Sequence, residues 1–526
     1  MVSSKTDTTS SQKRPLPGML VKAWNDPRTG FARAIGAAVL AGLIIGLLMP
    51  RGPASGWEAL LIMAVCLAAG LGAGFATRST WAILLAPAVN IIVIELFHTG
   101  LAGPTVGAIR LDEPFGILAF ILTRGFYALI GLLPMALGAG IGVLLGRRLS
   151  GTCVPAKGGA ARLGRAVSTV LAFAVAVFLV VLAVLIMLPA STPPIVGADG
   201  KQVPGSIAEL ATINVNGNDQ NLLIRGHSAD NPVLLYLAGG PGQSDLAYPR
   251  ALFGELEKNF TIVCWDGRGR GKSYGGFEPS STVTFENDVA DTIVVTDYLR
   301  ERFDEDKIYL IGESYGSFLG VRTVQQRPDL YYAYIGSGQM VSPGETDRRL
   351  YNDVLALANR TGDEAMAAKM RSYGEPPYKD VYGYTYVMNL YDALGEEFTP
   401  PAKYIELVRQ SGVNPLGVMA SEYTLVEKVN VLRGLFDVYS VMWPRMQEID
   451  FRKDAAKLDV PVYVFDAKYE LSARRDLALE WYGMLDAPKK RIYTMENAGH
   501  AAAFEGVEEF TRIMNEVVLP ETYPGS

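Results

Sequence analysis

The first third of the chain is dominated by long runs of apolar residues. A helix needs roughly 20 apolar residues to cross about 30 Å of hydrocarbon. Five runs approach or exceed this length: Phe31–Met49, Trp57–Ala76, Trp81–Phe97, Phe115–Gly146 and Ala166–Pro189. They predict an all-α membrane domain of about five transmembrane helices over residues 31–190. Residues 1–30 before it contain many Ser, Thr and Lys and are expected to form a disordered tail.

The fourth apolar run is longer than a single crossing requires. It contains Pro134 and carries Arg124 after only nine residues. Because nine residues cannot span a bilayer, we interpret the run as one kinked or tilted helix. Arg124 is then expected to reach the membrane interface or to pair with Glu95.

The positions of Lys and Arg around these runs predict the orientation of the membrane domain. Basic residues cluster before the first run, between the second and third, and between the fourth and fifth. Such residues favour the cytoplasmic side of a membrane. With five spans, the chain is expected to be a multi-pass cell-membrane protein with a cytoplasmic N-terminus and an extracytoplasmic C-terminal domain. Two spans in place of the fourth run would reverse this topology.

The formal net charge of −6 is distributed unevenly along the chain. Up to Ala190 there are 15 Lys and Arg against 6 Asp and Glu, whereas the remainder has 33 against 48. A basic apolar part followed by an acidic polar part is typical of a membrane region joined to a water-soluble domain. Nucleic-acid binding is not expected, because the basic residues flank apolar runs and form no single patch. The three cysteines have neither a disulfide framework nor metal-ligand spacing.

Beyond a linker at residues 191–206, short β-branched runs alternate with helical stretches. This pattern predicts a mainly parallel sheet in an α/β domain over residues 207–526. Strand signals fade over about residues 341–450, where a helical cap over the site is expected. The expected strands are Ala211–Val215, Leu222–Ile224, Val233–Leu237, Thr261–Trp265, Lys307–Ile311, Val460–Phe465 and Arg491–Met495, and the first expected helices are Glu286–Phe303 and Gly316–Gln326.

The segment Gly312–Gly316, with the sequence Gly-Glu-Ser-Tyr-Gly, lies between a predicted strand and a predicted helix. Its small residues permit a sharp turn that exposes a serine hydroxyl at the top of a sheet. Ser314 is therefore the candidate nucleophile. Such a serine needs a base, and His500 is the only one of the three histidines that follows it in the chain. The order of serine, acid and histidine is the one that α/β hydrolases use.

The acid that orients His500 is expected in the loop after the strand that ends at Phe465. This loop offers Asp466 and Glu470, with Asp476 further on. Either kind of carboxylate can orient an imidazole and stabilise its positive form, so the residues alone leave this choice open.

Two glycine-rich segments follow predicted strands. In the first, the backbone N–H groups of Gly239 and Gly240, together with that of Tyr315, are the candidate oxyanion hole. The second, Trp265–Ser273, departs from the spacing of a phosphate-binding loop, because Asp266 stands where the first glycine belongs. It is interpreted as a structural turn beside the active site.

Taken together, these motifs resemble those of the proline iminopeptidase branch of the α/β hydrolases, over roughly residues 207–519. That family shows HGGPG, DQRGxGxS and GxSxGS motifs and then a terminal histidine. The corresponding segments here are Ala238–Gly242, Asp266–Ser273 and Gly312–Ser317, followed by His500. Alignment of the strand before the acid implies that Glu470 is the acid, with Asp466 as the alternative.

The chain departs from the family pattern beside the predicted site. Ala238 replaces the family histidine, Gly267 replaces glutamine, and Glu313 and Tyr315 replace the usual glycine and tryptophan. The resemblance therefore implies the hydrolase machinery without implying specificity for an N-terminal proline. It does not cover the apolar runs.

The expected function is that of a membrane-anchored serine hydrolase that forms an acyl-enzyme and needs no metal or organic cofactor. An aminopeptidase acting on short peptides is the first candidate, and Glu313 and Glu345 are its candidate substrate-binding carboxylates. A carboxylesterase acting on small or lipid esters is the alternative within the same class. A non-catalytic membrane receptor or transporter subunit is the alternative outside it, although the presence of both Ser314 and His500 argues against this. The expected partners are the substrate and the lipid bilayer, and the oligomeric state is left open.

Overall fold

The computed structural model describes residues 27–153, 158–413 and 417–524, so most of the predicted disordered tail lies outside the described residues. The chain forms two compact units. The first contains the residues up to Pro50 together with residues 60–97 and 127–183. The second contains residues 51–59, 98–126 and 184–526. Three segments of the predicted membrane domain, residues 51–59, 98–126 and 184–190, therefore belong to the same unit as the C-terminal part.

Helices occupy all five of the predicted apolar runs. Among the described residues, four are long and apolar enough to cross a membrane, whereas the helix of the third run is shorter, with 17 residues. Their bounds are α2 (Pro27–Leu48), α3 (Gly56–Thr77), α4 (Ala82–His98), the continuous helical segment 114–149, and α7 (Gly159–Met187).

The fourth run forms one continuous helical segment, which confirms the interpretation as a single helix. Two π-helical stretches interrupt its regular α-helical hydrogen bonding, and Pro134 lies in the first turn of the helix that follows them. Arg124 donates to the carbonyl oxygens of Thr105, Val106 and Gly107 at 3.2, 3.3 and 3.1 Å. The consecutive parts are α5 (Pro114–Phe120), η1 (Ile121–Gly125), η2 (Ala128–Leu132) and α6 (Leu133–Leu149).

Small residues bring helices of the first unit close together. A Cβ atom on Gly70 or Gly74 of α3 would overlap the carbonyl oxygens of Met135 or Ala139 in α6. Conversely, a Cβ atom on Gly138 or Gly142 of α6 would overlap carbonyl oxygens of α3. The two backbones therefore meet directly, as small residues in apolar helices allow.

The second unit is built around one eight-stranded sheet with the order β1-β2-β4-β3-β5-β6-β7-β8. The strands β1 and β2 form an antiparallel hairpin, and β2 also pairs antiparallel with β4. All the remaining strand pairs are parallel. This is an α/β-hydrolase sheet, and it confirms the predicted, mainly parallel arrangement. The strands are β1 (Ile207–Val215), β2 (Asn218–Gly226), β3 (Val233–Leu237), β4 (Thr261–Asp266), β5 (Ile308–Glu313), β6 (Tyr331–Ser337), β7 (Val462–Ala467) and β8 (Lys490–Met495).

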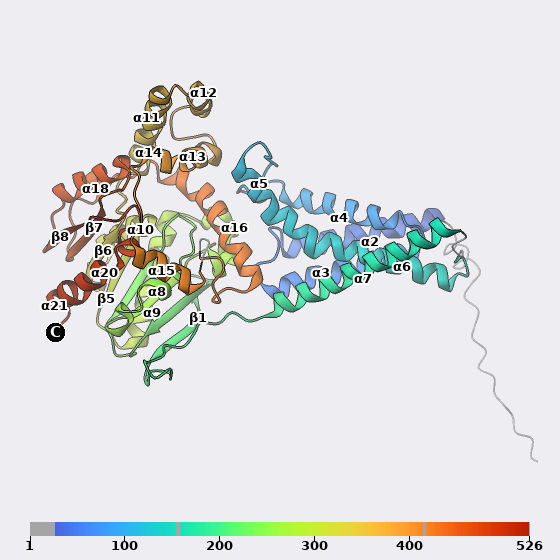
Figure 1. Ribbon diagram of the computed structural model, residues 1–526, viewed down its shortest axis with the longest axis horizontal. Helices are drawn as coiled ribbons and strands as arrows, with labels where there is room; N and C mark the ends of the chain where they lie inside the picture. The colour runs from blue at the N-terminus through green and yellow to red at the C-terminus, as the bar shows by residue number, and fades with distance from the viewer. Residues whose placement is uncertain (1–26, 154–157, 414–416, 525–526) are drawn as a thin grey trace, which may run out of the picture. The chain divides into compact units, whose positions relative to one another are not determined.

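Helices cover both faces of the sheet (Figure 1). Successive residues of a strand point to opposite faces, so Leu235 of β3 packs in one apolar cluster and Tyr236 in the other. The first cluster includes side chains of α9 (Phe285–Phe303), α10 (Tyr315–Gln326) and α18 (Ser472–Met484). The second includes α8 (Tyr248–Leu252), α19 (Ala502–Glu505), α20 (Val507–Ile513) and η8 (Met514–Val518), which α21 (Leu519–Thr522) follows.

A helical insert lies between β6 and β7, as predicted for a cap. The helix α16 of this insert begins with a capping box. The Thr424 hydroxyl accepts from the Glu427 backbone N–H, and the Glu427 carboxylate accepts from the Thr424 backbone N–H. The insert contains α11 (Pro343–Thr361), α12 (Glu364–Tyr373), α13 (Val381–Met388), α14 (Tyr391–Leu394), α15 (Ala402–Ser411), α16 (Leu425–Met442), η7 (Trp443–Met446) and α17 (Phe451–Asp454). Short 3₁₀ turns elsewhere are η3 (Leu256–Lys258), η4 (Gly271–Phe277), η5 (Ser280–Thr282) and η6 (Pro328–Leu330).

The strand β6 was not predicted from the sequence. Its residues, Tyr331–Ser337, include three tyrosines and three small residues and show no alternation of polar and apolar positions. The strand is buried on both faces in the middle of the sheet, so this alternation is not needed.

Replacing Gly316 with alanine is expected to destabilise the second unit by roughly 1–3 kcal/mol, because the new Cβ atom would overlap the Leu237 carbonyl of β3 and backbone atoms would have to move. Gly254→Ala is the matched control, since its Cβ atom would meet no heavy atom within 4 Å. Urea unfolding of both purified variants measures the difference. Equal unfolding free energies would show that the contact between α10 and β3 is not tight.

Candidate active site

Ser314 lies at the sharp turn between β5 and α10. Its backbone has φ 53° and ψ −117°, a conformation that costs energy for a residue other than glycine. The flanking glycines make the turn possible, because a Cβ atom on Gly312 would overlap the Gly316 carbonyl. The Ser314 N–H donates to the Ser337 carbonyl of β6 at 2.9 Å. The turn is therefore held on both sides by neighbouring strands.

The structure brings Ser314, His500 and Glu470 into one hydrogen-bonded chain. The Ser314 Oγ lies 2.9 Å from Nε2 of His500, and Nδ1 of the same ring is in short contact with Oε2 of Glu470. His500 comes from the loop after β8, and Glu470 from the loop after β7. The three side chains thus meet at the carboxyl ends of parallel strands, where open α/β sheets bind ligands.

Glu470 is buried and ionised. Burial alone would raise its pKa, but the charges of Arg474 and His500 and their hydrogen bonds lower it to about 2. Its Oε1 accepts from Nε of Arg474 at 2.9 Å and from the Leu471 N–H at 2.8 Å. Arg474 was not singled out in the sequence, although its position four residues after Glu470, at the start of α18, is the signal of a helical ion pair.

Asp466, the alternative acid, has different partners. It accepts from the guanidinium of Arg475 at 2.8 to 3.1 Å and from the Thr494 hydroxyl at 3.1 Å. These contacts direct its carboxylate toward α18 and β8. Among the described contacts, the carboxylate at the His500 ring is that of Glu470.

The glycine turn after β3 lies against the Ser314 turn. A Cβ atom on Gly239 would lie 3.4 Å from that of Ser314, and Gly240 has a φ of +111°, which favours glycine. The Gly239 N–H donates to the Asp245 carboxylate at 3.4 Å. Gly242 packs on α16, where a Cβ atom would come within 2.7 Å of the Gly434 carbonyl.

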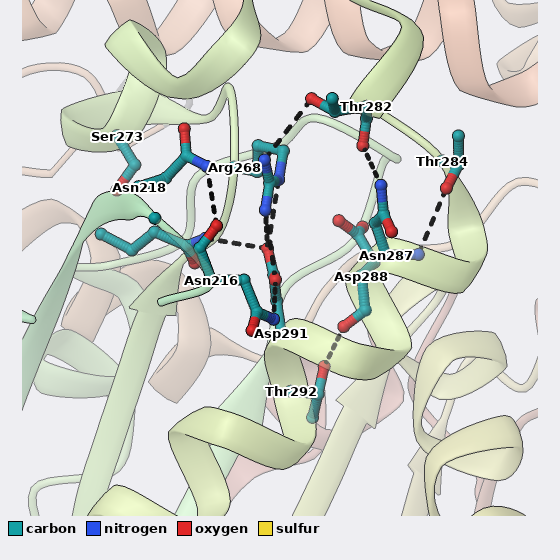
Figure 2. A network of polar contacts seen from close by, with 12 residues as sticks. Asn216, Asn218, Arg268, Ser273, Thr282, Thr284, Asn287, Asp288, Asp291 and Thr292 are labelled. Carbon is teal, nitrogen blue, oxygen red and sulfur yellow. Dashed lines mark hydrogen bonds and ion pairs between the residues drawn. The ribbon is translucent and has the colours of Figure 1, made fainter. Parts of the chain in front are cut away.

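The second glycine-rich turn, Asp266–Ser273, is held by protein side chains, as expected for a structural turn. Figure 2 shows Arg268 directed at Asp291 of α9, with Asn216 from the first hairpin bonded to the same carboxylate. Arg270 forms an ion pair with Asp288, which also accepts the Tyr315 hydroxyl at 2.7 Å. This turn therefore supports the residue that follows Ser314.

A cavity of about 870 Å³ opens beside Ser314 and His500. Apolar and aromatic side chains of the cap form much of its wall, including Met388, Tyr391, Tyr439 and Trp443. Among the described residues, six carboxylates line it against a single arginine, Arg474, which is paired with Glu470. The carboxylates are Asp347, Asp392, Glu396, Glu397, Glu470 and Glu505.

The two predicted substrate-binding carboxylates do not line this cavity in the described part of the chain. Glu313 is buried, and burial raises its pKa well above the usual range. Glu345 pairs with Arg348 and Arg349 on its own helix. Two residues further along α11, Asp347 does line the cavity and accepts from Trp443 and Gln447, each at 2.9 Å.

Among residues 27–153, 158–413 and 417–524, no group of three or more His, Cys, Asp or Glu side chains is arranged to hold a metal ion.

Comparison with known proteins agrees with this geometry. The sequence profile of the family "Serine aminopeptidase, S33" matches residues 236–376. The chain is 30% identical over 311 residues to "Probable aminopeptidase YbaC" of Bacillus subtilis (strain 168), which covers 59% of this chain and 96% of that protein. The chain belongs to the serine aminopeptidase-like family of α/β hydrolases. Nearly the whole length of this relative is thus covered by the alignment.

Solved structures with similar folds include two proteins of the iminopeptidase type. A proline iminopeptidase-related protein from Thermus thermophilus is 20% identical, with a TM-score of 0.41, and covers 60% of this chain and 99% of its own. A proline iminopeptidase from Mycobacterium smegmatis is 14% identical, with a TM-score of 0.43, and covers 60% of this chain and 100% of its own.

Wild type is expected to lose folding stability as the pH rises toward 7, because Asp347 must then ionise in a buried site. Asp347→Asn is expected to remove this part of the loss. Burial raises the pKa of Asp347 to about 7, above the roughly 3.9 of an unfolded chain. The neutral carboxyl group therefore contributes most to folded-state stability at pH values below roughly 3.9. This contribution decreases as the pH rises and is lost once the pH passes the folded-state pKa of about 7. Asparagine keeps an acceptor for Trp443 without the titration.

The measurement is the free energy of unfolding of wild type and Asp347→Asn at pH 5 and pH 8. Wild type should lose more stability than the variant over this interval. Asp266, whose pKa is also raised to about 7 by burial, is present in both proteins and cancels in the comparison. Parallel pH profiles would contradict the assignment.

Proposed function

We propose that this protein is a membrane-anchored serine aminopeptidase that acts on short peptides through an acyl-enzyme. The observation that carries the proposal is the hydrogen-bonded chain from Ser314 through His500 to the ionised Glu470, at a strained turn beside a cavity. Membership of a serine aminopeptidase-like family supports the same reaction class.

In the proposed mechanism, Oγ of Ser314 attacks the carbonyl carbon of the scissile bond while its proton moves to Nε2 of His500. Glu470 accepts from Nδ1 of the ring and stabilises the imidazolium that forms. The oxyanion is bound by the N–H groups of Gly240 and Tyr315, since the N–H of Gly239 already donates to Asp245. The imidazolium then protonates the leaving amine. Water, activated by the same histidine, hydrolyses the acyl-enzyme.

The acidic lining of the cavity supports an aminopeptidase, because such an enzyme must hold a substrate ammonium group. Asp392, Glu396 and Glu397 are exposed at the cavity, and Glu505 lies next to the histidine loop, where it accepts from the Gly499 N–H. A carboxylesterase acting on small or lipid esters is the second candidate. The apolar and aromatic cap side chains favour it, because they provide surface for an acyl chain.

Four apolar helices support the membrane anchor. With the short helix α4 as a fifth span, the distribution of Lys and Arg supports a cytoplasmic N-terminus and an extracytoplasmic hydrolase domain.

The reaction class is tested with alanine arylamide, its N-acetyl derivative and an acetyl aryl ester. An aminopeptidase should cleave the free-amine arylamide and lose nearly all activity on the acetylated one. Ser314→Ala should abolish turnover and labelling by a fluorophosphonate probe. Cleavage of the ester alone would establish the esterase. A folded wild type that neither labels nor turns over any substrate would support a receptor or transporter subunit without catalysis.

The identity of the acid is tested by Glu470→Gln against Asp466→Asn. Loss of the carboxylate that orients the imidazole should lower kcat about 10³- to 10⁴-fold with little change in KM. Asp466→Asn is the matched control, since it neutralises a neighbouring buried carboxylate that contacts Arg475 instead of His500. The opposite order of effects on kcat, at equal thermal stability, would make Asp466 the acid.

The orientation is tested with a membrane-impermeant thiol reagent on intact cells. Glu364→Cys places a thiol at an exposed position of α12 in the cap and should react. The native Cys153 is exposed in the loop predicted to be cytoplasmic and should react only after lysis. If Cys153 reacts in intact cells and the introduced cysteine does not, the hydrolase domain lies on the cytoplasmic side.

A further inference from the structure

One wall of the cavity comes from a segment far from the hydrolase sequence. Phe115, at the start of α5, lines the cavity together with Leu435 and Phe436 of α16. Its ring centroid lies 4.0 Å from that of Phe436 and 6.0 Å from that of Tyr382 in the cap. The ring is only partly buried, so it keeps apolar surface directed at the cavity.

The segment that carries Phe115 is fixed to the cap helix α16 by buried polar contacts. Asp437 is fully buried and accepts from the N–H and hydroxyl of Thr105 at 3.2 and 2.6 Å. Gly103 has a φ of +109° and lies so close that a Cβ atom would overlap the Asp437 carboxylate. Directly before Pro114, Glu113 pairs with Lys369 and accepts from the Tyr373 hydroxyl at 2.9 Å.

A second segment, the loop at residues 51–55 before α3, contacts the same face of α16. Asn430 donates to the Ala54 carbonyl at 2.9 Å, Arg433 to the Pro53 carbonyl at 3.2 Å, and Asp437 pairs with Arg51. Asn430, Arg433 and Asp437 are spaced three and four residues apart, which places them on one face of the helix. Leu435 and Phe436 line the cavity from the same helix, and Gly434 contacts the glycine turn at Gly242.

We propose that Phe115 is a specificity-determining residue that forms, with Phe436, a subsite for a large apolar group of the substrate. The substrate class is then an aminoacyl compound with a bulky aliphatic or aromatic side chain, in preference to one with a small side chain. This rests on the proposed function of Ser314. The start of α5 thus completes the substrate cavity, and an isolated C-terminal domain would lack this wall.

The experiment uses the full-length protein in detergent and compares arylamides of alanine, leucine and phenylalanine. Wild type should prefer leucine and phenylalanine. Phe115→Ala should lower kcat/KM for these two about tenfold or more and leave alanine arylamide within about threefold, because only the larger side chains reach the subsite. Phe115→Leu should retain most of the preference. Leu118→Ala is the matched control, since this leucine lies on the same helix, is exposed and does not line the cavity.

An equal loss on all three substrates, or no change, would overturn the proposal, provided that the thermal stability of the variant matches that of wild type. If wild type cleaves only esters, acetyl, butyryl and octanoyl aryl esters provide the same comparison through acyl length.

Labelling rates with ethyl and dodecyl fluorophosphonates separate the two proposals, because they need the nucleophile but not peptide turnover. Faster labelling by the dodecyl probe, lost in Phe115→Ala, would support the subsite even if no arylamide is cleaved. Labelling independent of chain length in both proteins would overturn it. If folded wild type is labelled by neither probe, both the proposed function of Ser314 and the proposed subsite at Phe115 are contradicted.

Discussion

The close approach of backbone at the turn between β5 and α10 is the constraint on which the site depends. Gly312 and Gly316 allow α10 to begin directly against β3, and Ser314 accepts a positive φ between them. Any side chain at the two glycine positions would push the helix away from the sheet. The turn then fixes the Ser314 hydroxyl at the carboxyl edge of the parallel strands, where the loops after β3, β7 and β8 also end. The hydrogen-bonded chain from Ser314 through His500 to Glu470 follows from this local fit together with the strand order.

Burial raises the pKa of the carboxylates near the site, and their charged partners decide whether the pKa ends above or below its usual range. Glu470 faces Arg474 and His500, so its pKa falls to about 2 and it stays charged. Glu313, one residue before the serine, is buried near Asp245 and Glu470, so its pKa rises well above the usual range. Of these two buried carboxylates, the one that contacts the imidazole is therefore the one that carries the charge. Environments that separate the pKa values of neighbouring acids are typical of catalytic sites.

Much of the C-terminal fold could be predicted from the sequence because its signals are local. The β1–β2 hairpin, the strands β3, β4, β5, β7 and β8, and the elbow helix all follow from short apolar runs and turn residues. The strand β6 could not, because its small residues and tyrosines derive their strand character from burial between β5 and β7. Ser314 and His500 could be predicted from their order in the chain and from the scarcity of histidines, and the structure places them 2.9 Å apart. The choice between Glu470 and Asp466 depends on side-chain direction, which the residues alone left open and the family resemblance resolved only by alignment.

Sequence motifs could not predict cavity residues that lie far from the hydrolase motifs in the chain. Phe115 looks like the start of one more apolar run, and nothing near it in sequence links it to a hydrolase cavity. Its place there depends on the contacts of Asp437 with Thr105 and Arg51, which join loops of the N-terminal region to α16. Buried polar pairs of this kind have no sequence signature, since each partner alone resembles an ordinary surface residue.

The reciprocal glycine contacts between α3 and α6 have a consequence for the order in which the chain matures. The groove on α3 formed by Gly70 and Gly74 fits only a backbone, and α6 supplies that backbone after α4 and α5 have been synthesised. Until α6 is made this groove has no backbone to fill it, although α2 already contacts the end of α3, where a Cβ atom on Gly30 would overlap the Ala76 carbonyl. The α3–α6 pair of the first unit therefore has both of its members before α7 and the hydrolase sequence are synthesised.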